Sequence, residues 1–195
     1  DDGFQSWSLK AYNQPPRERI VLRGNLIINN TDPAQPFKGS LQGIGCFDGP
    51  FIDWVIENNV IIVDHWHGIS LYEGHNCRIV NNTVVDINGE SPGPSWIMIT
   101  DHKDGTRSTS CIIRNNIANS VSASGDAVYE DHNYTVSYDQ YNDIFVSPED
   151  FDFHLKPGTA PVDAGLSEFI PPYDRDGNAR VYEISVDIGA YEYSE

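Results

Sequence analysis

The stretch that decides the fold is GISLYEGHNCRIVNNTVVD, residues 68–86, in which two β-rich runs flank a paired asparagine. The same pattern stands before it in WVIENNVII (54–62) and after it in CIIRNNIAN (111–119), and a weaker copy is IVLRGNLII (20–28). In each copy, apolar residues occupy alternate positions on both sides of the asparagine. Such alternation around a polar bend predicts two short strands joined by a sharp turn.

The spacing of these copies predicts a coiled β-structure. The second asparagines, at 25, 59, 82 and 116, are 34, 23 and 34 residues apart. Helical solenoids have similar repeat lengths, but their apolar period is 3.6, whereas here it is 2. A second set of strands starts at GFQSWS (3), GIGCFD (43), GISLYE (68), WIMITD (96) and DAVYED (126), with the inward residues Phe4, Ile44, Ile69, Ile97 and Ala127. We therefore predict an all-β, right-handed parallel β-helix of about five coils with three strands per coil.

The recurring asparagines have a structural role in such a coil. Equivalent residues of successive coils lie about 4.8 Å apart, so stacked side-chain amides can hydrogen-bond to the coils above and below. Asparagine also tolerates the left-handed backbone region that a sharp bend needs. We therefore expect Asn25, Asn59, Asn82 and Asn116 to form one ladder.

Composition and charge exclude several functions. The formal net charge is −17, from 29 acidic and 12 basic residues, so a nucleic-acid partner is not expected. No run of 18 apolar residues is present, so no membrane span is predicted. The chain opens within a predicted coil, at DDGFQSWS, which favours a fragment lacking its N-terminal coils or cap. We expect that missing part, or another chain, to cover the open end of the β-helix.

The coils, together with the end of the chain, resemble a known group of proteins. DFHLKPGTAPVDAG (152–165), DRDGNAR (174–180) and SVDIGAYEY (185–193) follow the coils. This arrangement resembles the pectate-lyase-like superfamily of right-handed parallel β-helix proteins, many of them bacterial lyases, epimerases and glycosidases acting on polysaccharides. The resemblance implies β-helix coils over 1–140, a C-terminal extension over 141–195 that packs on or caps them, and secretion from a bacterium.

A row of aromatic residues suggests a sugar-binding surface. Three residues past each inward anchor stand Trp7, Phe47 and Tyr72, then Thr100 and Glu130. A stripe of exposed rings offers a flat apolar surface for sugar rings, although a covering loop would turn it into a secondary core. We count Trp7, Phe47, Tyr72, Gln5 and His65 as candidate substrate-binding residues.

The next position in each coil carries an acidic ladder. Its members are Asp48, Glu73, Asp101 and Asp131. Carboxylates at this spacing could bind calcium or act as acid and base. The alternative is a solvated turn in which Asp simply favours the bend.

Histidine, lysine and tyrosine near this ladder predict β-elimination of a uronate-containing polysaccharide. In that scheme His67 or His102 is the base, Tyr72 the acid and Lys103 the group that neutralises the uronate. Asp48, Glu73 and Asp101 hold calcium or orient the histidines. Three alternatives remain open at this stage: a glycoside hydrolase that uses paired carboxylates, an epimerase, and a non-catalytic carbohydrate-binding or tail-fibre-like adhesin.

Overall fold

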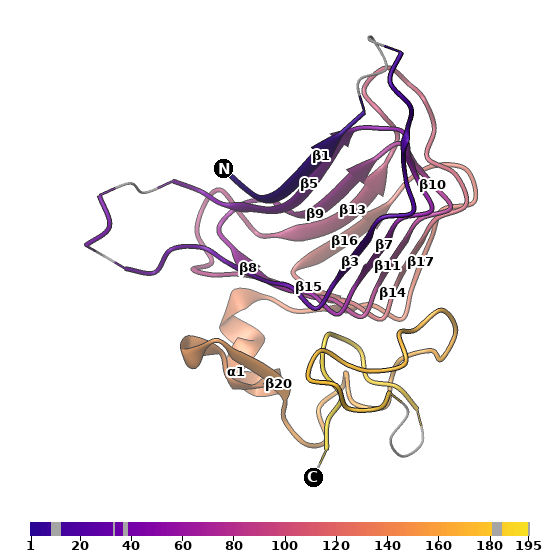
Figure 1. Cartoon of the computed structure of the whole chain (residues 1–195). Helices are drawn as coiled ribbons and strands as arrows, with labels where there is room; N and C mark the ends of the chain where they lie inside the picture. Colours follow the sequence, from indigo (N-terminus) through magenta and orange to yellow (C-terminus); the bar gives the residue numbers. More distant parts are fainter. Residues whose placement is uncertain (9–12, 33, 37–38, 181–184, 195) are drawn as a thin grey trace.

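The computed structural model describes residues 1–8, 13–32, 34–36, 39–180 and 185–194. The chain winds as a right-handed parallel β-helix of five coils, with a C-terminal segment packed against one side (Figure 1). Hydrogen-bonded neighbours in the three long sheets are parallel and come from successive coils. The predicted fold class and the number of coils are confirmed.

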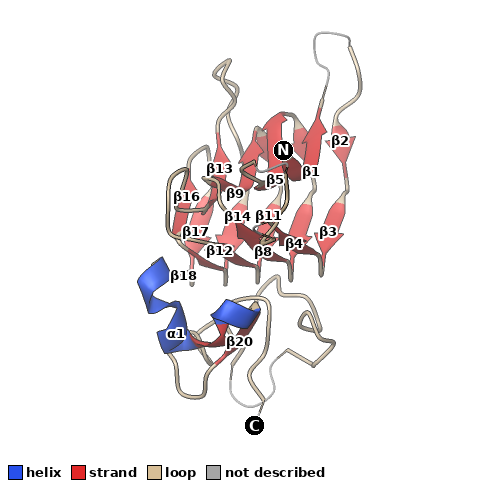
Figure 2. Cartoon of the chain, turned by 90° about the vertical axis from the view of Figure 1, so that its left-hand side faces the viewer, coloured by secondary structure: helices blue, strands red, loops and turns tan. Residues whose placement is uncertain are grey.

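Each coil contributes one strand to each of three sheets, and Figure 2 shows the strands stacked side by side. Sheet I consists of β1 (Asp2–Trp7), β5 (Gln42–Asp48), β9 (His67–Tyr72), β13 (Trp96–Thr100) and β16 (Ser120–Ala123). Sheet II consists of β3 (Val21–Arg23), β7 (Val55–Glu57), β11 (Arg78–Val80), β14 (Ile112–Arg114) and β17 (Tyr129–Asp131). Sheet III consists of β4 (Leu26–Ile28), β8 (Val60–Val63), β12 (Thr83–Asp86), β15 (Ile117–Ala118) and β18 (Tyr134–Thr135). The corner between sheets I and II holds β2 (Arg17–Glu18), β6 (Phe51–Ile52) and β10 (Gly74–His75).

The inward row of sheet I agrees with the prediction in four coils and differs in the fifth. Phe4 is opposite Ile44, Ile44 opposite Ile69, and Ile69 opposite Ile97. The fifth member is Val121 of β16, and the prediction of Ala127 is wrong. The strand β16 follows β15 almost directly, so its serine-rich sequence is easily taken for a turn. As a consequence DAVYED supplies β17, and both Glu130 and Asp131 lie in sheet II.

The asparagine ladder is confirmed and is longer than predicted. Each side-chain amide donates to the amide oxygen of the next coil, over 2.8 Å (Asn25 to Asn59), 2.8 Å (Asn59 to Asn82), 2.9 Å (Asn82 to Asn116) and 3.0 Å (Asn116 to Asn133). Asn133 escapes the sequence pattern because His132 precedes it where the other clear copies have asparagine. The residue before each ladder position has positive φ: Gly24, Asn58, Asn81, Asn115 and His132.

The C-terminal segment covers the outer face of sheet III. It contains η2 (Tyr138–Gln140), α1 (Tyr141–Ile144), β19 (Phe145–Ser147), η3 (Pro148–Asp150) and β20 (Asp152–Leu155). Outward side chains of sheet III such as Val60, Ile62 and Val85 form a second apolar core with Phe145 and Phe153 of this segment. The middle strands of sheet III, β8, β12 and β15, are therefore buried on both faces, which matches their nearly unbroken apolar sequences.

The first asparagine of each pair attaches this segment to the coils. The side-chain amide of Asn58 donates to the carbonyl of Tyr173 over 2.7 Å, and that of Asn115 to the carbonyl of Leu166 over 2.8 Å. The paired asparagines thus divide their work: the second stacks inside the coil and the first bonds the C-terminal segment outside it.

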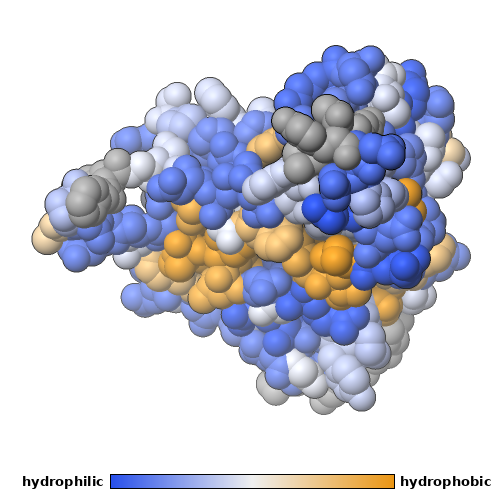
Figure 3. All heavy atoms as spheres, turned by 45° about the horizontal axis from the view of Figure 1, so that its top comes forward, coloured by the Kyte–Doolittle hydropathy of each residue, from blue (hydrophilic) through white to orange (hydrophobic). Residues whose placement is uncertain are grey.

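The first coil leaves apolar surface uncovered. Its strands β1, β3 and β4 are the terminal strands of their sheets, and Ile20, Val21 and Leu26 are exposed by 37%, 52% and 52%. Hydrophobic residues form a band across the view in Figure 3, bordered by hydrophilic ones. Such an end offers both unpaired backbone groups and apolar side chains to another strand layer. That a further segment or chain covers it stays a prediction.

Candidate functional site

Four rings gather on the outer face of sheet I. The ring of Phe47 lies edge-on to those of His67 (4.8 Å between centroids) and Tyr72 (5.5 Å), and His67 lies edge-on to Trp96 (5.0 Å). Irregularities in the strand register help to place them, since both Phe47 and Gly68 are extra residues relative to the neighbouring strand. Bulges of this kind re-aim side chains at functional sites.

A glycine makes room for the central ring. A Cβ atom at Gly45 would lie 2.8 Å from the ring of Phe47, too close for any other residue without a shift. The ring of Phe47 therefore lies over Gly45, two residues earlier in the same strand, and there it contacts the rings of both His67 and Tyr72. The sequence G-x-F at 45–47 is the local reason for this arrangement.

His67 is held in a defined orientation and stays neutral. Its Nδ1 is 2.8 Å from the hydroxyl of Ser70, which also accepts a hydrogen bond of 3.0 Å from the indole of Trp96. Burial, and then the neighbouring His65, lower the pKa of His67 to about 4. His65 stacks on His67 with 5.4 Å between the ring centroids. At neutral pH the His67 imidazole is uncharged. Its Nδ1 is bonded to Ser70, so Nε2 is the ring nitrogen that Ser70 leaves unoccupied.

A charged cluster lies next to these rings, at the ends of β5 and β13. Asp48 accepts from the ammonium group of Lys103 at 3.0 Å and lies 3.4 Å from Nε2 of His102. Asp104 is 2.8 Å from Nδ1 of the same histidine. The hydrogen bond from Lys103, supported by His102, holds the pKa of Asp48 below its usual range. Lys103 is 62% exposed, so its ammonium can also reach a ligand on this face.

The predicted aromatic platform has a hollow at one end. Gln5, Ser6, Trp7, Phe47 and Asp48 line a shallow depression of about 360 Å³. Trp7 is 47% exposed, so its ring is available to a ligand. Trp7, Phe47 and Tyr72 come from three successive coils, and Gln5 and His65 precede them in β1 and just before β9. We call this surface, from Trp7 to Trp96, the sheet I face.

The acidic ladder is not assembled as predicted. Glu73 is only 3% exposed and lies between β9 and β10, at a corner where its φ is positive. Asp101 pairs with Arg107 at 3.1 Å, and Asp131 lies on sheet II, where Arg114 binds it. The prediction of one row from Asp48 to Asp131 is therefore wrong: Asp131 was assigned through the misplaced fifth strand, Glu73 is buried, and Asp101 is paired with a cation.

The structure offers no assembled metal site among the residues it describes. No group of three or more histidine, cysteine, aspartate or glutamate side chains there is placed to hold an ion. Asp48, Glu73, Asp101 and Asp131 each have different neighbours. Calcium stays a prediction from the sequence, without a site in the described part of the chain.

Two residues of the sheet I face were not predicted. Ser70 orients His67, and Trp96 closes the cluster on the side of β13. Both point outward by the same alternation that placed Tyr72, since Ile69 and Leu71 are in the core. The signal was therefore present in the sequence, whereas the outward position of His67 depends on the bulge at Gly68.

Comparison with known proteins identifies no family for the chain. No protein-family model and no curated protein matches it. The solved structure of the pectate lyase Pel9A is similar, with a TM-score of 0.48 and 16% identity, over 99% of this chain and 58% of that one. The chain thus spans little more than half the length of that lyase. Its stacked parallel sheets make it a right-handed parallel β-helix protein.

Among the described residues, none of the helices has the length and apolar character that crossing a membrane requires.

Proposed function

We propose that the protein is a secreted enzyme that binds a uronate-containing polysaccharide along the sheet I face and cleaves it by β-elimination. The observation that carries the proposal is the contact of one ring, Phe47, with both His67 and Tyr72, beside the cluster of Asp48, His102 and Lys103. Aromatic rings can hold sugar faces, and the two neighbouring groups can take and give a proton.

The reaction can be written with these side chains. The ammonium of Lys103 pairs with the uronate carboxylate and stabilises the charge that develops when the C5 proton leaves. Nε2 of His67 takes that proton, in the tautomer whose Nδ1–H donates to the hydroxyl of Ser70. The electron pair of the C5–H bond forms the C4–C5 double bond, the C4–O bond breaks, and the hydroxyl of Tyr72 protonates the departing oxygen.

The pKa of His67 agrees with a role in the loaded site. A free-protein value of about 4 keeps the imidazole unprotonated at neutral pH. A uronate carboxylate beside the ring raises that pKa, because a nearby negative charge favours the imidazolium. The base therefore becomes stronger when the acidic substrate is bound.

A non-catalytic carbohydrate-binding protein is the second candidate. His102, the other histidine predicted as base, has both ring nitrogens near carboxylates of the protein itself. A glycoside hydrolase has less support, because Asp48 and Asp101 are each paired with a cation and Glu73 is buried. If the sheet I face only binds, Trp7 and Tyr72 matter for affinity while no polymer is shortened.

The test is product analysis on a panel of acidic polysaccharides, with and without a chelator. We expect an ultraviolet-absorbing unsaturated product, and a loss of about 10²–10⁴ in turnover for His67→Ala. His132→Asn is the matched control, since His132 lies on the other side of the coil, after β17. Saturated products would indicate a hydrolase. Binding without any change in polymer length would indicate the second candidate, and a requirement for calcium would appear as loss of activity in chelator.

A further inference from the structure

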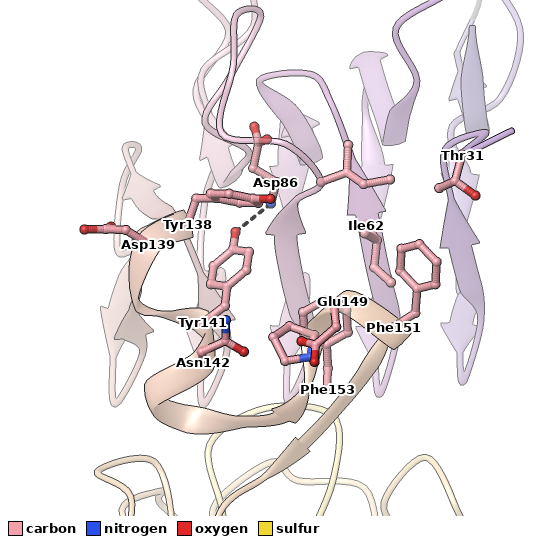
Figure 4. Close-up of a pocket in the computed structure, with 12 residues that line it drawn as sticks. Thr31, Ile62, Asp86, Tyr138, Asp139, Tyr141, Asn142, Glu149, Phe151 and Phe153 are labelled. Carbon is pink, nitrogen blue, oxygen red and sulfur yellow. Dashed lines mark hydrogen bonds between the residues drawn. The ribbon is translucent and has the colours of Figure 1, made fainter. Parts of the chain in front are cut away.

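A second hollow lies on the flank of the β-helix, between the outer face of sheet III and the C-terminal segment. Its volume is about 460 Å³, within the ~300–1000 Å³ range of small-molecule sites. Figure 4 shows Tyr138 and Tyr141 on one side, Phe151 on the other and Ile62 between them. We call it the flank hollow. The remaining lining residues are Thr31, Asp86, Ile87, Asp139, Asn142, Pro148, Glu149 and Phe153.

The lining selects against acidic ligands. It contains the carboxyl groups of Asp86, Asp139 and Glu149, and no lysine, arginine or histidine is among its described residues. Asp139 and Glu149 are exposed and can accept hydrogen bonds from a ligand. Asp86 is 1% exposed, and its Oδ2 has no hydrogen-bond partner within the described part of the chain. A ligand of this site therefore carries hydrogen-bond donors and no negative charge.

The rings of the flank hollow are held in place. The hydroxyl of Tyr141 accepts from the side-chain amide of Asn119 at 2.7 Å and from the backbone N–H of Asp86 at 2.9 Å. Phe151 has a φ of 62°, a left-handed conformation that is costly for a bulky side chain. Phe151 is nonetheless 37% exposed, whereas Phe153, two residues later, is 3% exposed and belongs to the second core. Phe151 thus combines a costly backbone conformation with a partly exposed ring at the surface of the hollow, where a ligand can contact it.

We propose that the flank hollow binds a sugar unit without an acid group, as a second carbohydrate site. The apolar face of such a ring packs on Phe151 and Tyr138, which are both exposed, while its hydroxyls donate to Glu149 and Asp139. The site would hold a neutral branch or neighbouring chain while the sheet I face holds an acidic one. The inference stands without the proposed lyase activity, because no residue of the flank hollow belongs to the sheet I face.

Titration calorimetry of the full chain with neutral oligosaccharides of glucose, xylose, mannose and galactose tests the proposal, with oligogalacturonate as the acidic probe. We expect at least one neutral probe to bind, and Phe151→Gly to weaken its binding about tenfold or more through loss of the stacking ring. Because glycine adopts a positive φ without strain, this variant should keep or raise the melting temperature. Phe151→Tyr should retain binding.

Three control variants distinguish binding in the flank hollow from binding elsewhere on the protein. Tyr173→Ala removes an exposed ring of the same segment outside the hollow and should leave binding within about twofold. Trp7→Ala and His67→Ala change the sheet I face and should not affect the neutral probe, so this inference can fail or hold whether or not the lyase proposal does. The inference is overturned if no neutral probe binds up to ~10 mM, if Phe151→Gly binds as well as the parent, or if oligogalacturonate occupies this site.

Discussion

The sheet I face and the flank hollow lie against the same coils, yet their charged groups differ. The sheet I face carries the exposed ammonium of Lys103, paired with Asp48, beside its aromatic rings. The flank hollow has rings and carboxyl groups, with no basic side chain among the described residues that line it. A parallel β-helix can therefore offer two surfaces that differ in the ligand charge they accept, because each sheet has its own row of outward-facing side chains.

The two regions also differ in how they are built. The sheet I face consists of outward side chains from successive coils, so its spacing follows the strand separation. The flank hollow exists only because the C-terminal segment packs on sheet III, and most of its lining comes from that segment. Changes that release the segment should therefore remove one region and spare the other.

The largest effect is expected for Arg180→Ala. The Arg180 side chain is fully buried, pairs with Glu192 at 2.6 Å and donates to Asn58 at 2.7 Å. Removing it leaves a buried carboxylate unpaired, which should lower the free energy of unfolding by about 3–5 kcal/mol. Urea denaturation measures this. Neutral-sugar binding should be lost while the far-ultraviolet signal of the coils remains.

The control is Arg19→Gln, which changes an exposed pair with Glu18 and should alter the free energy of unfolding by less than ~0.5 kcal/mol. A similar small change for Arg180→Ala would contradict the buried attachment.

The second prediction changes the sheet I face alone. Lys103→Ala removes the ammonium that would neutralise a uronate, and turnover on an acidic polymer should fall about 10²–10³-fold. Initial rates at saturating polymer measure the effect. Calorimetry of the same variant should show unchanged binding of a neutral oligosaccharide. If both ligands are lost together, the two regions are one site.

The third prediction compares two positions of the asparagine ladder. Asn82 lies in the middle of the ladder and is fully buried, so Asn82→Ala leaves amide groups of its neighbours unsatisfied and should cost about 1–3 kcal/mol. Asn25 lies at the exposed end, and Asn25→Ala should cost less than ~1 kcal/mol. Denaturation midpoints give both values. Equal losses would mean that the ladder contributes the same at its end as in its centre.

The smallest effect is a pH dependence of opposite sign for His67 of the sheet I face and His154 of the C-terminal segment that forms the flank hollow. Burial lowers the pKa of His154, but hydrogen bonds to Asp152 at 2.6 Å and Asp176 at 2.9 Å outweigh it and raise the pKa. Its contribution to stability is therefore complete below the ordinary histidine pKa of ~6.5 and is lost as the pH rises through the raised value. His67, with its pKa lowered to about 4, instead costs stability as the pH falls from ~6.5 to about 4.

Melting temperatures of two variants measure this difference. His154→Gln should lower the melting temperature more at about pH 5.5 than at about pH 9, by less than ~1 kcal/mol equivalent because the side chain is 42% exposed. His67→Gln should instead raise it slightly at about pH 4. The same direction for both histidines would show that one of the two environments is wrongly assigned.

Local pattern predicted the coils well and the site only in part. The alternation around Asn59, Asn82 and Asn116 was enough to predict sheets II and III, because residues at the same distance in sequence from each asparagine lie side by side in successive coils. The fifth strand of sheet I was not placed, since its run SVSA (120–123) alternates only one valine and one alanine with serine, which is a weak apolar signal. That misplacement put Asp131 into a row with Asp48, while the burial of Glu73 and the pairing of Asp101 with Arg107 could not be seen in the spacing.

By itself the sequence determined the parallel coil, its asparagine ladder and the outward positions of Phe47 and Tyr72. These features depend on alternating apolar and polar residues that recur at equivalent positions in successive coils. Tertiary structure alone decided the rest. Bulges brought His67 against Ser70, a turn carried Lys103 to Asp48, and the C-terminal segment bonded to Asn58 and enclosed the flank hollow. Such contacts join residues far apart in the chain or out of phase in a strand, so no local spacing encodes them.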